Sequence, residues 1–128
     1  MAYVLVLEID AQRRAILRQA FEAVGKEVVD VDDSGSAVLR VMDDTPEVII
    51  VDEEMPPFEG LDLVPLLRRM TEAPIIATGS ADQTNLVKTL LEGADMYVTR
   101  PYNTRVILAR ATALVRRARL NAEARNAE

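Results

Sequence analysis

The chain of 128 residues carries a formal net charge of −6 and is 49% hydrophobic, which suits one domain with one apolar core. It contains no cysteine and no histidine, which excludes a disulfide framework, thiolate and imidazole metal ligands, and catalysis by a histidine base. No apolar run is long enough to cross a membrane and the first residues do not form a secretory signal, so we expect a cytoplasmic protein.

Strand-like and helix-like segments alternate along the chain. From the N-terminus we expect a strand at 3–10, a helix at 13–24, a strand at 26–31, and a helix that begins with Ser34 as its N-cap. There follow a strand at 47–52, a helix opened by Gly60 and Asp62, a strand at 73–78, a helix at 82–93, a strand at 95–99 and a helix that starts at 103. The domain is expected to cover 1–120, with 121–128 as a polar helical tail or the start of a linker.

This alternation predicts an α/β fold. A helix between two parallel strands makes a right-handed crossover, and such units build a parallel sheet with helices on both faces. The third and fourth strands are nearly continuous apolar runs, as a sheet buried on both faces requires. We therefore predict a three-layer sandwich around a five-stranded parallel sheet.

Acidic residues follow two of the predicted strands. Glu8 and Asp10 come after the first strand, while Asp52, Glu53 and Glu54 come at the end of the third. Ligands of open parallel sheets bind beyond the carboxyl ends of the strands, where the strand order reverses, so these side chains should converge in one cleft. Clustered carboxylates favour a bound cation, and Mg²⁺ prefers such oxygen ligands. Glu53 alone is interpreted as a loop acid that faces solvent.

The remaining strand ends favour phosphoryl transfer over nucleotide binding. The first strand–helix turn has no glycine, and the chain has neither a G-x-G-x-x-G nor a Walker A sequence. The fourth strand ends in T-G-S, Thr78 to Ser80, and the fifth in T-R-P-Y, which contains Arg100. A carboxylate nucleophile, a cation site, a hydroxyl and a basic side chain around one cleft are what phosphorylation of an aspartate needs.

Two segments carry a resemblance to a known family. V-D-E-E-M-P-P-F-E-G at 51–60 and G-A-D-M-Y-V-T-R-P-Y at 93–102 resemble the receiver domain of two-component response regulators, over residues 3 to 120. The resemblance implies a flavodoxin-like (βα)5 fold with strand order 2-1-3-4-5. It implies Asp52 as the phosphoacceptor, Glu8 as a metal-site acid and the Glu54 backbone carbonyl as a metal ligand. It also implies a signalling role for the Tyr97 ring and a cis peptide bond before the proline.

Three positions depart from that pattern. Ile9 stands where the family has a second metal-binding acid, so Mg²⁺ is expected to bind weakly or not at all. Gly79 stands where the family has the hydroxyl residue that follows the fourth strand, and Arg100 replaces a lysine. Ser80 or Thr78 could supply the missing hydroxyl, and strand alternation favours Ser80.

These features leave two functions open, neither of them an enzyme. One is a phosphorelay receiver that takes a phosphoryl group onto Asp52 from a histidine kinase or phosphotransfer protein. It would signal to an effector, an output domain or a second copy through the face of the fourth helix, fifth strand and fifth helix. The alternative is an atypical, phosphorylation-independent interaction module. Nucleic acid is a remote partner, because the basic last helix lacks interleaved aromatic residues.

Overall fold

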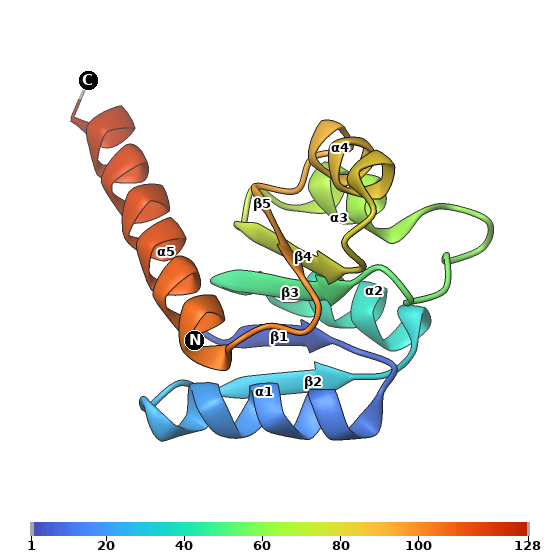
Figure 1. The fold of residues 1–128 in the computed structure, drawn as a ribbon. Coiled ribbons are helices and arrows are strands. Elements are labelled where there is room, and N and C mark those ends of the chain that lie inside the picture. Colours follow the sequence, from blue (N-terminus) through green and yellow to red (C-terminus); the bar gives the residue numbers. More distant parts are fainter. Residues whose placement is uncertain (1, 128) are drawn as a thin grey trace.

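Strands and helices alternate through the whole described chain, which is residues 2–127 of a computed structural model (Figure 1). The elements are β1 (Val4–Leu7), α1 (Ala11–Ala23), β2 (Val28–Val31), α2 (Ser34–Asp43), β3 (Val48–Asp52), α3 (Leu63–Met70), β4 (Ile75–Gly79), α4 (Gln83–Leu91), β5 (Met96–Thr99) and α5 (Thr104–Asn126). All strand pairs are parallel, and the order is β2-β1-β3-β4-β5. The predicted fold and strand order are therefore confirmed.

Each face of the sheet has its own apolar core, because successive side chains of a strand point to opposite faces. Leu5, Leu7 and Ile49 pack with residues of α2 and α3. Val6 and Ile50 point the other way and pack with residues of α1 and α5. Figure 1 shows the resulting three layers, with α4 on the same side as α3. β1 and β3 are buried along their whole length, so the strand ends they present are held firmly in place.

The start of one helix differs from expectation. The N-cap of α2 is Asp33, whose side chain accepts a hydrogen bond from the Ser36 N–H, and not Ser34. Ser34 is instead the first helical residue, and its buried hydroxyl donates to the carbonyl of Pro56. At the other end of the chain, α5 continues to Asn126 and extends well past the sheet (Figure 1). Residue 128, part of the expected tail, lies outside the described residues.

Within residues 2–127, no helix is both long enough and apolar enough to cross a membrane.

Candidate functional site

Two buried carboxyl groups lie at the carboxyl edge of the sheet, on neighbouring strands. Glu8 directly follows β1 and Asp52 is the last residue of β3, and each residue is only 1% exposed. β1 and β3 pair along their length, so their ends meet where the strand order reverses. The structure therefore brings Glu8 and Asp52 to one edge, and such buried charges must be paired or hydrogen-bonded to persist.

Asp52 is held by three hydrogen-bond donors. Its Oδ1 accepts from the Thr78 hydroxyl at 2.7 Å and from Arg100 Nε at 3.0 Å, and its Oδ2 accepts from the Glu54 N–H at 3.0 Å. Asp52 and Thr78 are register partners on adjacent parallel strands, so their side chains share one face of the sheet. The alternation argument that favoured Ser80 over Thr78 is wrong on this point, because register with β3 puts Thr78 beside Asp52. The backbone N–H of Ser80 donates to Glu53 at 2.8 Å.

Glu8 is paired with Arg13, a residue that the sequence reasoning missed. Arg13 Nε lies 2.8 Å from Glu8 Oε1, and Arg13 Nη2 lies 2.9 Å from Glu54 Oε1. The hydrogen bond to Glu8 raises the pKa of Arg13 above its ordinary value. The signal that could have found this contact is the position of Arg13, in the first turn of the helix that follows Glu8.

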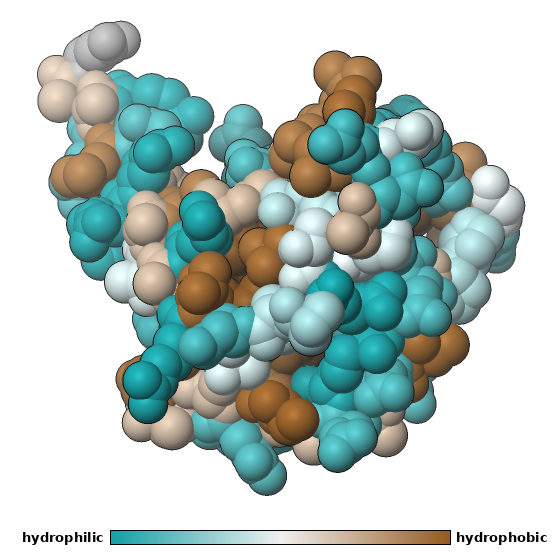
Figure 2. Space-filling view, in the orientation of Figure 1, coloured by the Kyte–Doolittle hydropathy of each residue, from teal (hydrophilic) through white to brown (hydrophobic). Residues whose placement is uncertain are grey.

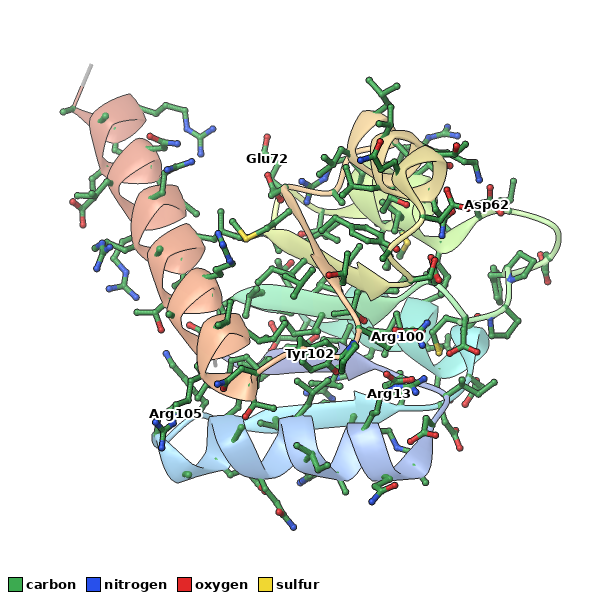
Figure 3. The ribbon with its side chains drawn as sticks, viewed as in Figure 1. Arg13, Asp62, Glu72, Arg100, Tyr102 and Arg105 are labelled. Carbon is green, nitrogen blue, oxygen red and sulfur yellow. The ribbon has the colours of Figure 1, made fainter. Side chains whose placement is uncertain are left out.

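The guanidinium group of Arg100 also lies close to the Glu54 carboxylate. Arg100 follows β5, and its Nη2 lies 3.2 Å from Glu54 Oε1. Figure 3 shows Arg13, from α1, and Arg100 at the same edge of the sheet, with Tyr102 close by. The bond between Arg100 and Pro101 is cis, as the family resemblance implies. Two arginines thus converge on an acidic cleft.

Asp10 does not join this cleft. Its side chain accepts the N–H of Arg13 at 2.9 Å and caps the N-terminus of α1. This hydrogen bond lowers the pKa of Asp10. The expected convergence of every acid after β1 therefore holds for Glu8 and not for Asp10, because an acid directly before a helix satisfies that helix's free N–H groups.

The residues present do not fit a divalent cation in this arrangement. The oxygens of Glu8 accept from Arg13 Nε and from the Asp10 N–H, at 2.8 and 3.1 Å, and Glu54 Oε1 lies between two guanidinium groups. The family's second acid is absent, and Ile9 in its place is 48% exposed. Across residues 2–127 no cluster of three acidic side chains is arranged as a metal site. Mg²⁺ would have to displace Arg13 to reach Glu8.

Glu53 is the second site residue that the sequence misjudged. Its side chain is only 18% exposed, and it was expected to face solvent. Its carboxylate accepts from the Ser80 N–H at 2.8 Å, from the Tyr97 hydroxyl at 2.9 Å and from the Asn85 side-chain amide. The reason is local space: Gly79 has no side chain, and the carboxylate occupies the volume that one would fill.

Tyr102 lies beside the cleft with a buried hydroxyl that has no hydrogen-bond partner among the described residues. Burial, followed by the negative charges of Glu8 and Asp52, raises the pKa of Tyr102 from 10.0 to about 12. Burial and the Glu53 hydrogen bond raise the pKa of Tyr97 to about 12. Both phenols therefore stay protonated in the folded chain at pH values where the unfolded chain ionises.

We expect Tyr102→Phe to change the alkaline stability of the domain more than its neutral stability. Above pH 10 the unfolded wild type releases protons that the folded state keeps, so its free energy of unfolding falls as the pH rises from about 10 to about 12. Removal of the unpartnered hydroxyl should cost little at neutral pH and should flatten this fall. Urea unfolding at a series of pH values measures both effects, and an unchanged alkaline slope would refute the assignment.

The fold and the acidic residues at the strand ends are those of a receiver domain, and comparison with known proteins gives the same class. The response regulator receiver domain model matches residues 4–112. The chain therefore belongs to the response regulator receiver family: it is a receiver domain of two-component signalling, a signalling module and not a catalytic enzyme. Receiver domains typically bind Mg²⁺.

Particular relatives are regulators of transcription. The chain is 29% identical to the transcriptional regulatory protein CpxR of Escherichia coli K12 over 127 residues, 98% of this chain and 54% of that protein. It is 33% identical to the transcriptional regulatory protein KdpE of Mycobacterium tuberculosis over 118 residues, 91% of this chain and 52% of that protein. The chain thus spans about half the length of these curated relatives.

Solved structures agree in fold. The receiver domain of the Francisella response regulator 1452 superposes with a TM-score of 0.83 at 26% identity, covering 92% of this chain and 99% of that one. NtrX from Brucella abortus superposes with a TM-score of 0.87 at 18% identity, covering 100% of this chain and 30% of that one, and this likeness concerns the fold alone.

Proposed function

We propose that this receiver domain works as a protein-interaction module whose signalling does not depend on phosphorylation of Asp52. The observation that carries the proposal is the position of Arg13. Its guanidinium group pairs with both Glu8 and Glu54. A divalent cation in the cleft would have to bind the same acidic groups. A positive group of the chain itself thus already bridges these two acids.

The charge balance of the cleft supports this proposal. Four carboxylates face two guanidinium groups there: Glu8, Asp52, Glu53 and Glu54 against Arg13 and Arg100. The balance is negative, so an anionic phosphodonor meets net repulsion unless a further cation enters. The Oδ1 of Asp52 also accepts two hydrogen bonds, which makes this oxygen a weaker nucleophile toward phosphorus.

A second candidate function is phosphoryl acceptance on Asp52, favoured by one specific observation. Thr78 and Arg100 lie at 2.7 and 3.0 Å from Asp52 Oδ1, where they could stabilise charge on a phosphoryl group. In that reaction an Asp52 oxygen bonds phosphorus as the phosphorus–nitrogen bond of a donor phosphohistidine breaks, and the imidazole leaves. The donor would be a histidine kinase, the partner implied by membership of a two-component family, or a phosphotransfer protein.

In either case we propose the α4–β5–α5 face as the output surface. Leu91 and Val87 of α4 are 83% and 53% exposed, and Figure 2 shows hydrophobic surface over this helix. Exposed apolar side chains that gather on one helix are typical of interaction sites. The partner would be a downstream effector, an attached output domain or a second copy of this chain, in the cytoplasm.

Incubation of the chain with acetyl phosphate and Mg²⁺, followed by intact-mass measurement, tests the proposed function. We expect no gain of a phosphoryl group, because Arg13 and Arg100 already pair with the carboxylates of Glu8, Asp52 and Glu54 that a cation would need. A receiver domain with the usual acidic pair, treated in parallel, shows that the donor is active. A stoichiometric phosphoryl adduct that Asp52→Asn abolishes would overturn the proposal in favour of the second candidate.

A further inference from the structure

The carboxylate of Glu53 is surrounded by hydrogen-bond donors from three other parts of the fold. Ser80, in the loop after β4, donates its N–H to Oε1 at 2.8 Å, and Tyr97 of β5 donates its hydroxyl to Oε2 at 2.9 Å. Asn85 of α4 donates its side-chain amide to the same Oε2. Arg100 Nη2 lies farther off, 3.5 Å from Oε1. Donors in such number stabilise an ionised carboxylate strongly.

The site exists because residue 79 is glycine. A Cβ atom built there would overlap both the Glu53 carboxyl group and the Tyr97 hydroxyl. Gly79 is not among the residues with a positive φ, so its backbone does not require glycine. What it supplies is space. Any residue with a side chain at this position would expel Glu53 or Tyr97 from its place.

The Tyr97 hydroxyl ties the site to the backbone as well. It lies 2.8 Å from the Ser80 carbonyl oxygen and 2.9 Å from Glu53 Oε2, so two acceptors compete for its single proton. The orientation of Tyr97 is thus set by Glu53 and Ser80 together, on the strand that runs through the centre of the proposed output face.

We propose that Glu53 is a resident anion that clamps the β4–α4 loop, α4 and Tyr97 in one arrangement. The clamp acts without modification of Asp52, because the negative charge that gathers the donors belongs to the chain itself. The consequence of the clamp rests on the proposed function. An output face that is always in one state needs no phosphorylation to reach that state.

The test compares Glu53→Ala and Glu53→Gln with the wild type by NMR, without any phosphodonor. The Ser80 amide should exchange its hydrogen about tenfold faster in Glu53→Ala, since the lost acceptor is a charged one. The Tyr97 ring signals, assigned with Tyr97→Phe, should shift or broaden. Glu53→Gln should show a smaller change, because it keeps an acceptor oxygen and loses the charge.

Two further variants make the result specific. Gly79→Ala should also shift or broaden the Tyr97 ring signals, because its Cβ overlaps both the Glu53 carboxyl group and the Tyr97 hydroxyl. Glu22→Gln removes one negative charge on α1, far from the site, and should leave Ser80 and Tyr97 unchanged. Circular dichroism confirms that each variant is folded. Unchanged exchange at Ser80 and unchanged Tyr97 signals in folded Glu53→Ala would overturn the clamp.

The tests of the clamp and of the proposed function have independent outcomes. Loss of protection at Ser80 in Glu53→Ala supports the clamp even if acetyl phosphate modifies Asp52 in the wild type. Unchanged protection overturns the clamp even if no phosphoryl group is ever found on Asp52.

Discussion

Replacement of Arg13 by alanine is expected to lower the free energy of unfolding by about 2 to 3 kcal/mol. Glu8 is 1% exposed. Without Arg13 its buried carboxylate would keep only the Asp10 N–H as a hydrogen-bond donor. Loss of one partner of a buried pair is costly for this reason, usually about 3 to 5 kcal/mol, and the partial exposure of Arg13 lowers the effect below that range. Urea unfolding at neutral pH measures it.

The matched control is Arg18→Ala on the same helix. Arg18 pairs with Asp30 and Glu22, and its side chain is 42% exposed, so its removal should cost about 0.5 kcal/mol. The double variant Glu8→Gln with Arg13→Ala should recover much of the loss, since no charge is then left buried. Equal costs for Arg13→Ala and Arg18→Ala would show that Arg13 does not hold Glu8 in the folded chain.

A divalent-cation site is expected to appear when Ile9→Asp and Arg13→Ala are combined. The first change adds the carboxylate that the family carries and the second removes a guanidinium group from the cleft, so the local charge becomes more negative by two units. One unit charge at about 4 Å is worth about 4 kcal/mol at a typical effective dielectric constant, and 1.4 kcal/mol is a tenfold change in affinity. The double variant should therefore bind Mg²⁺ at least about tenfold tighter than wild type.

Calorimetric titration with Mg²⁺, and water-proton relaxation with Mn²⁺, measure this gain. Ile9→Asp alone should gain little, because Arg13 still occupies Glu8 and Glu54. Adding Asp52→Asn to the double variant should abolish binding and so locate the ion in the cleft. If the unmodified chain binds Mg²⁺ as tightly as the double variant, Arg13 yields readily to a metal and the present account of the cleft is wrong.

The fold and the position of the cleft could be predicted because they depend on backbone periodicity. Apolar runs such as Val48–Val51 form strands wherever they are buried on both faces, and an acid at the end of such a run lies at the sheet edge by geometry alone. Asp52 and Glu8 were placed in this way. Departures at Ile9 and Gly79 were also visible, since they concern residue type at a position of the chain.

What periodicity could not give is the direction of long side chains. Arg13 was given no role and Glu53 was interpreted as a loop acid, yet Arg13 pairs with Glu8 and Glu53 accepts a hydrogen bond from Tyr97. Such contacts depend on rotamers and on unfilled volume nearby, which a single sequence does not display. For Glu53 that volume is the one left open by Gly79.

The overlap at Gly79 has a consequence for how this domain could change over generations. A threonine at 79 would restore the family's hydroxyl, yet its Cβ would collide with the Glu53 carboxyl group. Substitution at 79 first would therefore pass through a chain that has lost the clamp. Substitution at Glu53 first removes only one of the two overlaps, because a Cβ atom at 79 would still collide with the Tyr97 hydroxyl. A side chain at 79 is thus coupled to two other positions: it can be accommodated only when the carboxyl group of residue 53 and the ring of residue 97 both give way.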